Sequence, residues 1–211
     1  MNGTESHSIT LGMGCFWSPD ALFGQLAGVI RTRVGYAGGT TEHPTYREMG
    51  DHSEAVQIEY DPVRLSLEAL LELFWSSHKP ININEYKGRQ YQSLVLYHDA
   101  DQLGAIERVL NDIEAQGEGR PDTEVAPLTA FYTAEERHQK YYLKRYPDAI
   151  TKLASLYPSA EELTRATLAA RLNGLAKGYT NLARVCEELR TWPVSKEDRE
   201  RMIRLVKQIK W

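Results

Sequence analysis

Residues 8–36, SITLGMGCFWSPDALFGQLAGVIRTRVGY, contain the elements that decide the fold. Residues 8–11 form a short apolar run that ends at glycines, as a buried strand does. Residues 18–20 (Ser-Pro-Asp) supply a cap, a proline and an acid, and together they predict the start of a helix. Residues 29–36 are rich in β-branched side chains and predict a second strand. The stretch is therefore a strand, a helix and a strand.

A comparable set of elements follows. Residues 55–60 (AVQIEY) alternate as a strand does, residues 66–78 have apolar side chains at helical spacing behind a serine, and residues 93–97 (SLVLY) predict another strand. The order strand, helix, strand, strand, helix, strand is that of the split βαβ plan. We therefore expect an α+β protein with a two-layer, ferredoxin-like plait core, in which the sheet is mixed but mostly antiparallel.

Three more elements are expected before residue 147. The pattern predicts a helix over residues 101–115 and an edge strand over residues 123–127. A Thr-x-x-Glu capping box opens a predicted helix over residues 133–142.

The chain after residue 147 has a different character. Its pattern is helical throughout, with predicted helices over residues 160–172, 182–190 and 195–208. Residues 1–149 have a net charge of about −9, whereas residues 150–211 have about +5. We therefore expect a catalytic domain over residues 1–147 and a helical C-terminal extension over residues 148–211.

Composition narrows the class of protein. The 211 residues have a net charge of −4, which argues against nucleic-acid binding as the default. No run approaches the roughly 18 apolar residues that cross a bilayer, and the first residues lack the features of a signal peptide. We expect a cytoplasmic monomer without nucleic-acid or membrane partners.

The cysteines and histidines do not predict a metal site. The two cysteines, Cys15 and Cys186, are too few for a disulfide scaffold, and neither lies in a Cys-x-x-Cys pair. The six histidines are scattered without the spacing of zinc ligands.

Cys15 is the first candidate for chemistry. It lies between a predicted strand and a predicted helix, where free backbone N–H groups and the helix dipole stabilise a thiolate. The alternative is a small, buried, unreactive side chain, the commoner state of a lone cysteine. Phe16 and Trp17 follow directly, and they either line an apolar pocket beside the thiol or pack at the start of the helix.

Eight short motifs in order along residues 8–145 give the chain a recognisable pattern. They are Gly14-Cys15-Phe16-Trp17, Gly35-Tyr36-Ala37-Gly38-Gly39, His43-Pro44-Thr45-Tyr46, His52-Ser53-Glu54-Ala55-Val56, Tyr60-Asp61-Pro62, Phe74-Trp75 with His78, Gln90-Tyr91 with Ser93, and Glu135-Glu136-Arg137-His138-Gln139. In these motifs the chain resembles the type A peptide methionine sulfoxide reductases.

The resemblance implies an enzyme that reduces the S-epimer of methionine sulfoxide, free or in proteins, to methionine. Cys15 matches the nucleophile, Glu54 the acid, and Tyr46 and Tyr91 the hydroxyls around the sulfoxide oxygen. Phe16 and Trp17 match the pocket for the substrate's methyl group.

Elementary chemistry supports these roles. A thiolate attacks a sulfoxide sulfur only if the oxygen can accept a proton, so the site needs an acid and hydrogen-bond donors. Burial that raises the pKa of Glu54 would keep it protonated near neutral pH, and tyrosine hydroxyls are neutral donors. Without the resemblance, the better prediction for Glu54 is a solvated charge at a strand end. His138 is expected to hold a hydrogen-bond network behind the site rather than to transfer protons.

The product on Cys15 is a sulfenic acid, which a thiol must reduce. No metal or organic cofactor is implied, and the reducing equivalents come from thioredoxin, glutathione or another thiol. Cys186 is the internal candidate for a resolving cysteine, although its surroundings predict an ordinary helix. The alternative is direct reduction of Cys15 by the external thiol.

The chain departs from the family pattern in two loops. Tyr86 stands two residues before Gly88, where the family has an acid, and the sequence leaves open whether Glu85 replaces that charge. Asp51 replaces the glycine before His52, in a shortened loop. Two other functions therefore stay open: a cysteine-based peroxidase, and a weakened or non-catalytic relative that binds methionine sulfoxide or a peptide.

Overall fold

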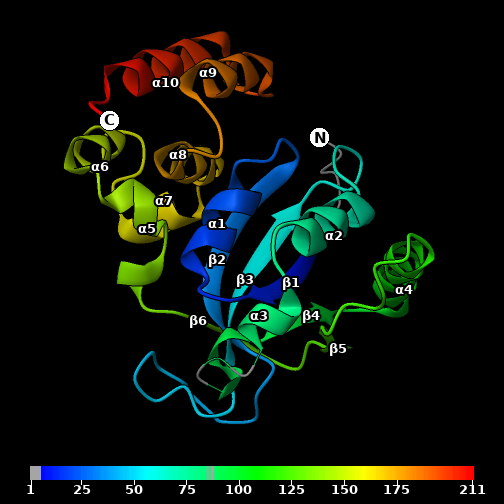
Figure 1. The fold of residues 1–211 in the computed structure, drawn as a ribbon. Helices are drawn as coiled ribbons and strands as arrows, with labels where there is room; N and C mark the ends of the chain where they lie inside the picture. The colour runs from blue at the N-terminus through cyan, green and yellow to red at the C-terminus, as the bar shows by residue number, and fades with distance from the viewer. Residues whose placement is uncertain (1–5, 85, 87) are drawn as a thin grey trace.

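The structure of the chain is a computed structural model, and it describes residues 6–84, 86 and 88–211. Its centre is a mixed six-stranded sheet in the order β5-β4-β1-β3-β2-β6 (Figure 1). The strands are β1 (His7–Met13), β2 (Val29–Ala37), β3 (Ser53–Tyr60), β4 (Ser93–Tyr97), β5 (Glu124–Pro127) and β6 (Phe131–Thr133). The expected α+β class is confirmed.

The strand register explains why the sequence forms this sheet. β1 pairs antiparallel with β3 and β4, β2 pairs antiparallel with β3, and β5 pairs parallel with β4 at the edge. Successive residues point to opposite faces, so in β4 Val95 joins the main core while Leu94 and Leu96 pack on the other face. Both faces of the central strands are therefore largely buried.

Among the described residues, seven helical segments belong to the N-terminal part. They are α1 (Trp17–Gly24), α2 (Leu67–Ser76), α3 (Pro80–Ile83), the 3-10 turn η1 (Gly88–Tyr91), α4 (Ala100–Ala115), the 3-10 turn η2 (Glu136–His138) and α5 (Tyr141–Lys144). The two longest have side-chain caps: Ser66 accepts from the Ala69 N–H before α2, and Asp99 accepts from the Gln102 N–H before α4. The predicted starts of these two helices are thus correct to within a residue.

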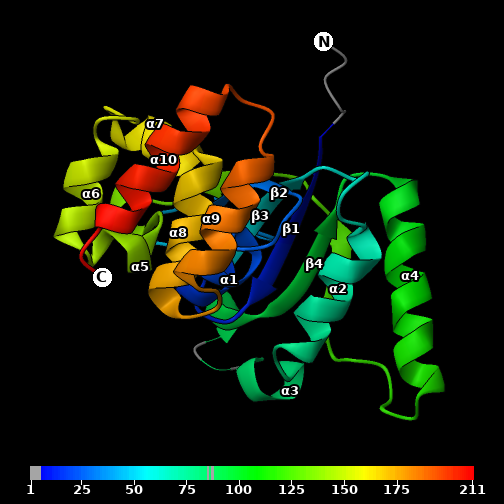
Figure 2. The ribbon, with the colours of Figure 1, turned by 90° about the horizontal axis from the view of Figure 1, so that it is seen from above.

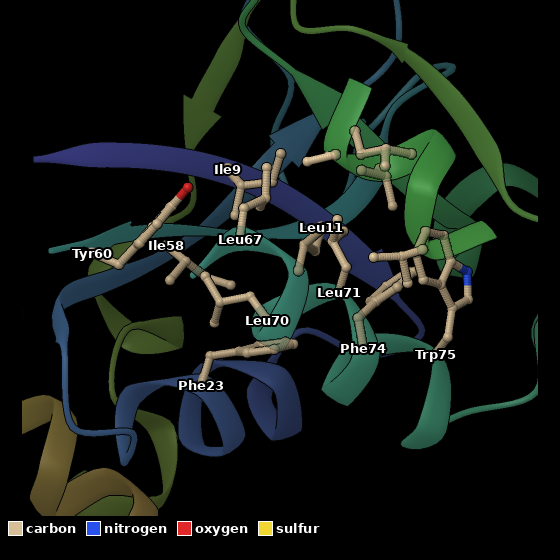
Figure 3. Packing of buried hydrophobic residues seen from close by; sticks show 14 of the residues in the cluster. Ile9, Leu11, Phe23, Ile58, Tyr60, Leu67, Leu70, Leu71, Phe74 and Trp75 are labelled. Carbon is tan, nitrogen blue, oxygen red and sulfur yellow. The ribbon is translucent and has the colours of Figure 1, made fainter. Parts of the chain in front are cut away.

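The main core lies between the sheet and helices α1, α2 and α4. Ile9 and Leu11 of β1 face Leu70, Leu71 and other side chains of α2 (Figure 3). Each of these aliphatic side chains is fully buried, which stabilises the fold by about 1.5–3 kcal/mol per side chain. This layer fixes the positions of β1 and β3, the strands next to the candidate site.

The C-terminal helices form a second core. They are α6 (Pro147–Leu153), α7 (Ala160–Arg165), α8 (Thr167–Lys177), α9 (Leu182–Thr191) and α10 (Lys196–Gln208). Their shared apolar cluster includes Leu153, Leu168, Leu172, Leu189 and Val206. Figure 2 shows this group gathered beside α1, on the opposite side from α2 and α4.

The helix expected over residues 133–142 is wrong. Residues 131–133 are strand β6, and only a 3-10 turn and the short helix α5 follow. The break is at Lys140, which has φ 51°, in the left-handed region. The ammonium of Lys140 is fully buried and donates to Asp20 Oδ1 at 2.8 Å. A buried ion pair with a residue distant in sequence therefore overrides the local helical pattern.

Two other helix predictions need correction. The single helix expected over residues 160–172 is two helices, because Ala166 has extended backbone (φ −76°, ψ 129°) between α7 and α8. Ser18 does not cap α1, since the helix begins at Trp17 and the Ser18 hydroxyl lies 3.0 Å from the Tyr142 hydroxyl instead.

The part of the chain that the structure describes contains no helix long and apolar enough to cross a membrane. Among the same residues there is no group of three or more His, Cys, Asp or Glu side chains that could hold a metal ion.

Candidate active site

Cys15 lies in the turn between β1 and α1. Gly14 makes this turn with φ 84°, a conformation that glycine adopts without strain. At Gly12 the backbone of β1 passes close to the neighbouring chain, since a Cβ there would lie 2.8 Å from the Gln92 carbonyl oxygen. The two glycines thus let the end of β1 lie against its neighbour and turn sharply, so that the exposed residue Cys15 stands at the start of α1.

The thiol of Cys15 has two polar partners. The backbone N–H of Trp17 lowers the pKa of the thiol, and the carboxyl of Glu54 raises it. Desolvation by the surrounding atoms is the main reason that the pKa of Cys15 rises to about 11, and the charge of Glu54 adds to it. The expected stabilisation by the helix start is present as the Trp17 contact, but it is outweighed. The expectation of a ready thiolate in the free protein is therefore wrong.

Glu54 projects from β3 into the interior. It is 1% exposed, and its carboxyl accepts from the Phe16 N–H at 3.0 Å and from Gln90 Nε2 at 2.9 Å. The alternative of a solvated charge is wrong, because the residue is buried. Burial disfavours the charged form of a carboxyl, so the site suits a group that takes up and releases a proton.

Tyr46 and Tyr91 supply two hydroxyls beside this pair. The two side chains interact with each other electrostatically. Burial, with a smaller contribution from the charge of Glu54, raises the pKa of Tyr91 to about 12. Tyr91 thus remains a neutral donor at physiological pH, in electrostatic contact with both Glu54 and Cys15.

The loop that carries Tyr46 is tied to the sheet through Glu135. One Glu135 oxygen accepts from the Tyr46 N–H at 3.2 Å, and the other accepts from the Tyr36 hydroxyl at 2.6 Å. Burial alone would raise the pKa of Glu135, but these hydrogen bonds hold it below its ordinary value. Glu135 is therefore a charged anchor between β2 and the loop.

Tyr91 is positioned by the turn η1. Arg89 in this turn forms an ion pair with Glu124 at 2.7 Å and donates to the carbonyl oxygens of Gly38 and Asp51. The arginine therefore connects η1 to the edge strand β5 and to the loop after β2, which fixes Gln90 and Tyr91 near Glu54.

Asp51, the residue at one of the loop departures, has a structural role. Its carboxyl accepts from the backbone N–H groups and hydroxyls of Thr40 and Thr41, at 2.8–3.0 Å. These bonds hold its pKa far below the ordinary value.

At the other departure from the family pattern, Tyr86 is 61% exposed, and its ring stacks on that of Tyr91 with 5.7 Å between the ring centroids. Glu85 lies outside the described residues.

Phe16 and Trp17 differ in their burial and in their contacts. Phe16 is 1% exposed and packs in a small cluster with Tyr36, so it is covered in the free protein. Trp17 is half-buried and stacks on Tyr141 with 3.7 Å between ring centroids. The Trp17 indole N–H donates to Nδ1 of His138 at 3.3 Å.

His138 is thus a partner of an aromatic side chain. It is buried, and desolvation lowers its pKa. The neutral ring therefore accepts a hydrogen bond from the indole N–H. Its ring also lies 5.4 Å from that of Phe16 and 4.8 Å from that of Tyr46. This arrangement agrees with a role in holding the pocket residues.

Cys186 is buried in α9, with 3% exposure, and both cysteines are free thiols. Its neighbours along the helix, Val185 and Leu189, point into the C-terminal core. Reaction of Cys186 with Cys15 would need this packed helix to open.

The structure adds Gln90 and Glu135 to the site residues selected from the sequence. Gln90 holds Glu54, and Glu135 holds Tyr36 and Tyr46. Both lie in motifs of the family pattern, but nothing local predicts their partners, because Glu135 and Tyr36 are 99 positions apart.

Comparison with known proteins gives a consistent family. Residues 7–171 match the family model for peptide methionine sulfoxide reductase. The chain is 40% identical over 194 residues to a peptide methionine sulfoxide reductase of Drosophila melanogaster, covering 90% of this chain and 76% of the relative. It is 42% identical over 153 residues to peptide methionine sulfoxide reductase MsrA of Nocardia farcinica, covering 70% and 89%.

Solved structures resemble the fold as well. Methionine sulfoxide reductase A of Corynebacterium diphtheriae superposes with a TM-score of 0.57 at 31% identity, over 70% of this chain and 78% of that one. The reduced form of Mxr1 from Saccharomyces cerevisiae superposes with a TM-score of 0.62 at 27% identity, over 69% and 88%.

Proposed function

The chain belongs to the peptide methionine sulfoxide reductase family, and from this membership we propose that it reduces methionine S-sulfoxide, free or in proteins, with Cys15 as the nucleophile. The observation that carries the proposal is the contact between an accessible cysteine and a buried carboxyl, Glu54, beside two tyrosine hydroxyls. Each group has a place in the chemistry of sulfoxide reduction.

Cys15 and Glu54 act as a pair that shares one proton. In the free protein the proton is on the thiol, whose pKa is raised to about 11. When substrate displaces water, the proton moves to the carboxyl, and the thiolate attacks the sulfoxide sulfur. Glu54 then passes the same proton to the sulfoxide oxygen. In net terms the oxygen and the proton end on Cys15 as a sulfenic acid, and the sulfoxide becomes methionine.

Tyr46 and Tyr91 stabilise the negative charge that develops on the oxygen. Burial raises the pKa of Tyr91 to about 12, so this hydroxyl keeps its proton and can donate during the reaction. Trp17, held by His138 and Tyr141, is proposed to wall the space for the substrate's methyl group, with Phe16 behind it.

Regeneration is proposed to use an external thiol, thioredoxin or a smaller molecule. The support is the burial of Cys186 in α9, which keeps its thiol from the accessible Cys15. An attacking thiolate reduces the sulfenic acid through a mixed disulfide, which a second thiol resolves.

A single-turnover experiment without reductant tests the proposal. Separate S- and R-epimers of methionine sulfoxide are mixed with wild type, Cys15→Ser and Cys186→Ser, and released methionine and lost thiols are counted. We expect about one methionine per chain from the S-epimer alone, none from Cys15→Ser, and one thiol lost. Loss of two thiols would make Cys186 the resolving cysteine.

The same experiment separates the other functions. Binding of sulfoxide without methionine release would indicate a non-catalytic relative. A peroxidase that uses Cys15 would turn over peroxide without a general acid, so Glu54→Gln would leave peroxide turnover intact. Loss of sulfoxide reduction in Glu54→Gln is the result expected of a reductase.

Four further features of the chain belong to the same proposal: the type of core, a domain boundary, the oligomeric state and the location in the cell. The antiparallel order β4-β1-β3-β2 supports a ferredoxin-like plait as the core. The boundary between a catalytic domain (1–147) and a helical extension (148–211) remains a prediction, and so do a monomeric state and a cytoplasmic location. The match to the family model extends to residue 171, into the helices of the extension.

A further inference from the structure

The position of Cys15 depends on a short helix. α1 has eight residues and no side-chain N-cap, and a helix of this length is not stable by itself in water. Cys15 stands two residues before Trp17, the first residue of this helix, whose backbone N–H lowers the pKa of the thiol. Glu54, by contrast, is fixed by a central strand. The distance between nucleophile and acid therefore depends on what holds α1 in place.

The N-terminal half of α1 is held through Asp20. This carboxylate is fully buried and accepts from Lys140 Nζ at 2.8 Å and from Asn173 Nδ2 at 3.1 Å. Asn173 lies on α8, and its Oδ1 accepts from the Leu143 N–H at 3.0 Å. One side chain of α8 thus joins the first turn of α1 to α5, the segment whose Tyr141 stacks on Trp17.

The C-terminal end of α1 is held by Arg171, also on α8. This side chain is 2% exposed and donates to the carbonyl oxygens of Gly24 at 2.6 Å and of Val29 at 2.7 Å. It forms an ion pair with Glu188 of α9 at 2.8 Å. The last carbonyls of a helix lack intrahelical partners and carry partial negative charge, so a buried cation there fixes the helix end.

Helices α1 and α8 also pack closely against each other. A Cβ on Gly174 of α8 would lie 2.4 Å from Gln25 Cβ and 2.9 Å from the Ala21 carbonyl oxygen. A Cβ on Gly24 would lie 3.0 Å from the Ala170 carbonyl oxygen. α8 therefore sets the position of α1 along its length, as their adjacent ribbons show (Figure 2).

We infer that α8 is a positioning element for the nucleophile. Arg171 and Asn173 are positioning residues: they hold the two ends of α1, and thereby set the distance between Cys15 and Glu54. The C-terminal helices then belong to the catalytic unit. The inference rests on the proposed function only where kcat is the readout. The second readout, the reactivity of Cys15 towards an alkylating agent, is measured without substrate.

A matched pair of glycine variants tests the inference. Gly174→Ala adds a methyl group against α1, whereas Gly104→Ala adds the same group on α4, where it would meet only Arg108 Nη1 at 3.5 Å. We expect Gly174→Ala to lower kcat by about 10- to 100-fold with KM within about twofold, since small misplacements of reacting groups have effects of this size. Gly104→Ala should change neither.

Alkylation of Cys15 by iodoacetamide gives a readout independent of sulfoxide reduction. The titratable groups that interact with the thiol are Glu54 from β3 and Tyr91 from η1, and Tyr91 in turn interacts with Tyr46 from the loop after β2. Displacement of α1 changes their distances to the thiol, so we expect Gly174→Ala to shift the pH midpoint of alkylation, followed by mass spectrometry of the Cys15 peptide. Gly104→Ala should keep the wild-type midpoint.

Arg171 variants keep the test decisive if Gly174→Ala does not fold. Arg171→Met should lose kcat and shift the alkylation midpoint, and Arg171→Lys should recover part of both. Leu189→Ala, in the C-terminal core, serves as a control of similar instability. Wild-type kcat and midpoint in Arg171→Met, or the same changes in Leu189→Ala, would overturn the inference. If wild type releases no methionine, the proposed function fails, while the alkylation midpoints still decide this inference.

Discussion

Lys140→Met removes the cation of a buried ion pair and leaves the backbone strain unchanged, because neither residue is glycine. Lys140 is fully buried, and its ammonium donates to Asp20 Oδ1 at 2.8 Å, to the Thr32 carbonyl oxygen at 2.7 Å and to the Thr32 hydroxyl at 3.0 Å. The variant leaves the Asp20 carboxylate buried with only neutral donors, among them Thr32 Oγ1 and Asn173 Nδ2.

The expected loss follows from the burial of that charge. Removing one partner of a buried ion pair costs about 3–5 kcal/mol, a large part of the roughly 5–15 kcal/mol that a domain has in total. The unfolding entropy of a chain of 211 residues is about 0.44 kcal/mol/K at about 2.1 cal/mol/K per residue, so Tm should fall by about 7–11 °C. Urea unfolding and thermal melting followed by circular dichroism at pH 7 measure both quantities.

Two controls separate burial from charge itself. Arg108→Met removes a cation from the exposed pair between Arg108 and Glu68, and it should cost less than about 1 kcal/mol. The double variant Asp20→Asn with Lys140→Met removes both buried charges and should lose much less than the sum of the two single changes. A loss below about 1 kcal/mol for Lys140→Met, or additive single losses, would refute the reasoning.

Three further predictions concern the site and the core. Glu54→Gln should lower methionine release by about 10²–10⁴-fold. It should also lower the pKa of Cys15 from about 11, because the Glu54 charge raises that pKa. Alkylation of Cys15 at pH 8–9 should then be faster than in wild type, and slower alkylation would contradict the predicted direction of the pKa change. Tyr91→Phe should lower kcat by about 10²-fold with little change in KM, in steady-state assays, because one donor to the oxygen is lost. Phe74→Ala, at a fully buried position, should cost about 3–5 kcal/mol in urea unfolding, whereas Val63→Ala, at an 82% exposed position, should stay within about 0.5 kcal/mol.

Some features could be predicted from the sequence because they depend on neighbouring residues. The apolar run within residues 93–97 and the serine before residue 67 are local signals, and β4 and α2 begin where those signals place them. Cys15 could be selected from its place between a strand and a helix, whereas Glu54 could be selected only through its motif in the family pattern.

The rest depends on partners that the chain order keeps apart. The left-handed conformation of Lys140 has no local cause, because its partners Asp20 and Thr32 are 120 and 108 positions away. The pKa of Cys15 likewise depends on burial and on Glu54 of another strand, which outweigh the helix start that the sequence shows.

The sequence by itself therefore determined the order of the central strands and helices and indicated the candidate site residues, because short-range pattern and motif encode both. Tertiary structure decided the protonation of Cys15, the break at Lys140 and the support of α1 by α8. These depend on desolvation and on buried polar contacts, whose strength is set by atoms brought together only when the chain has folded.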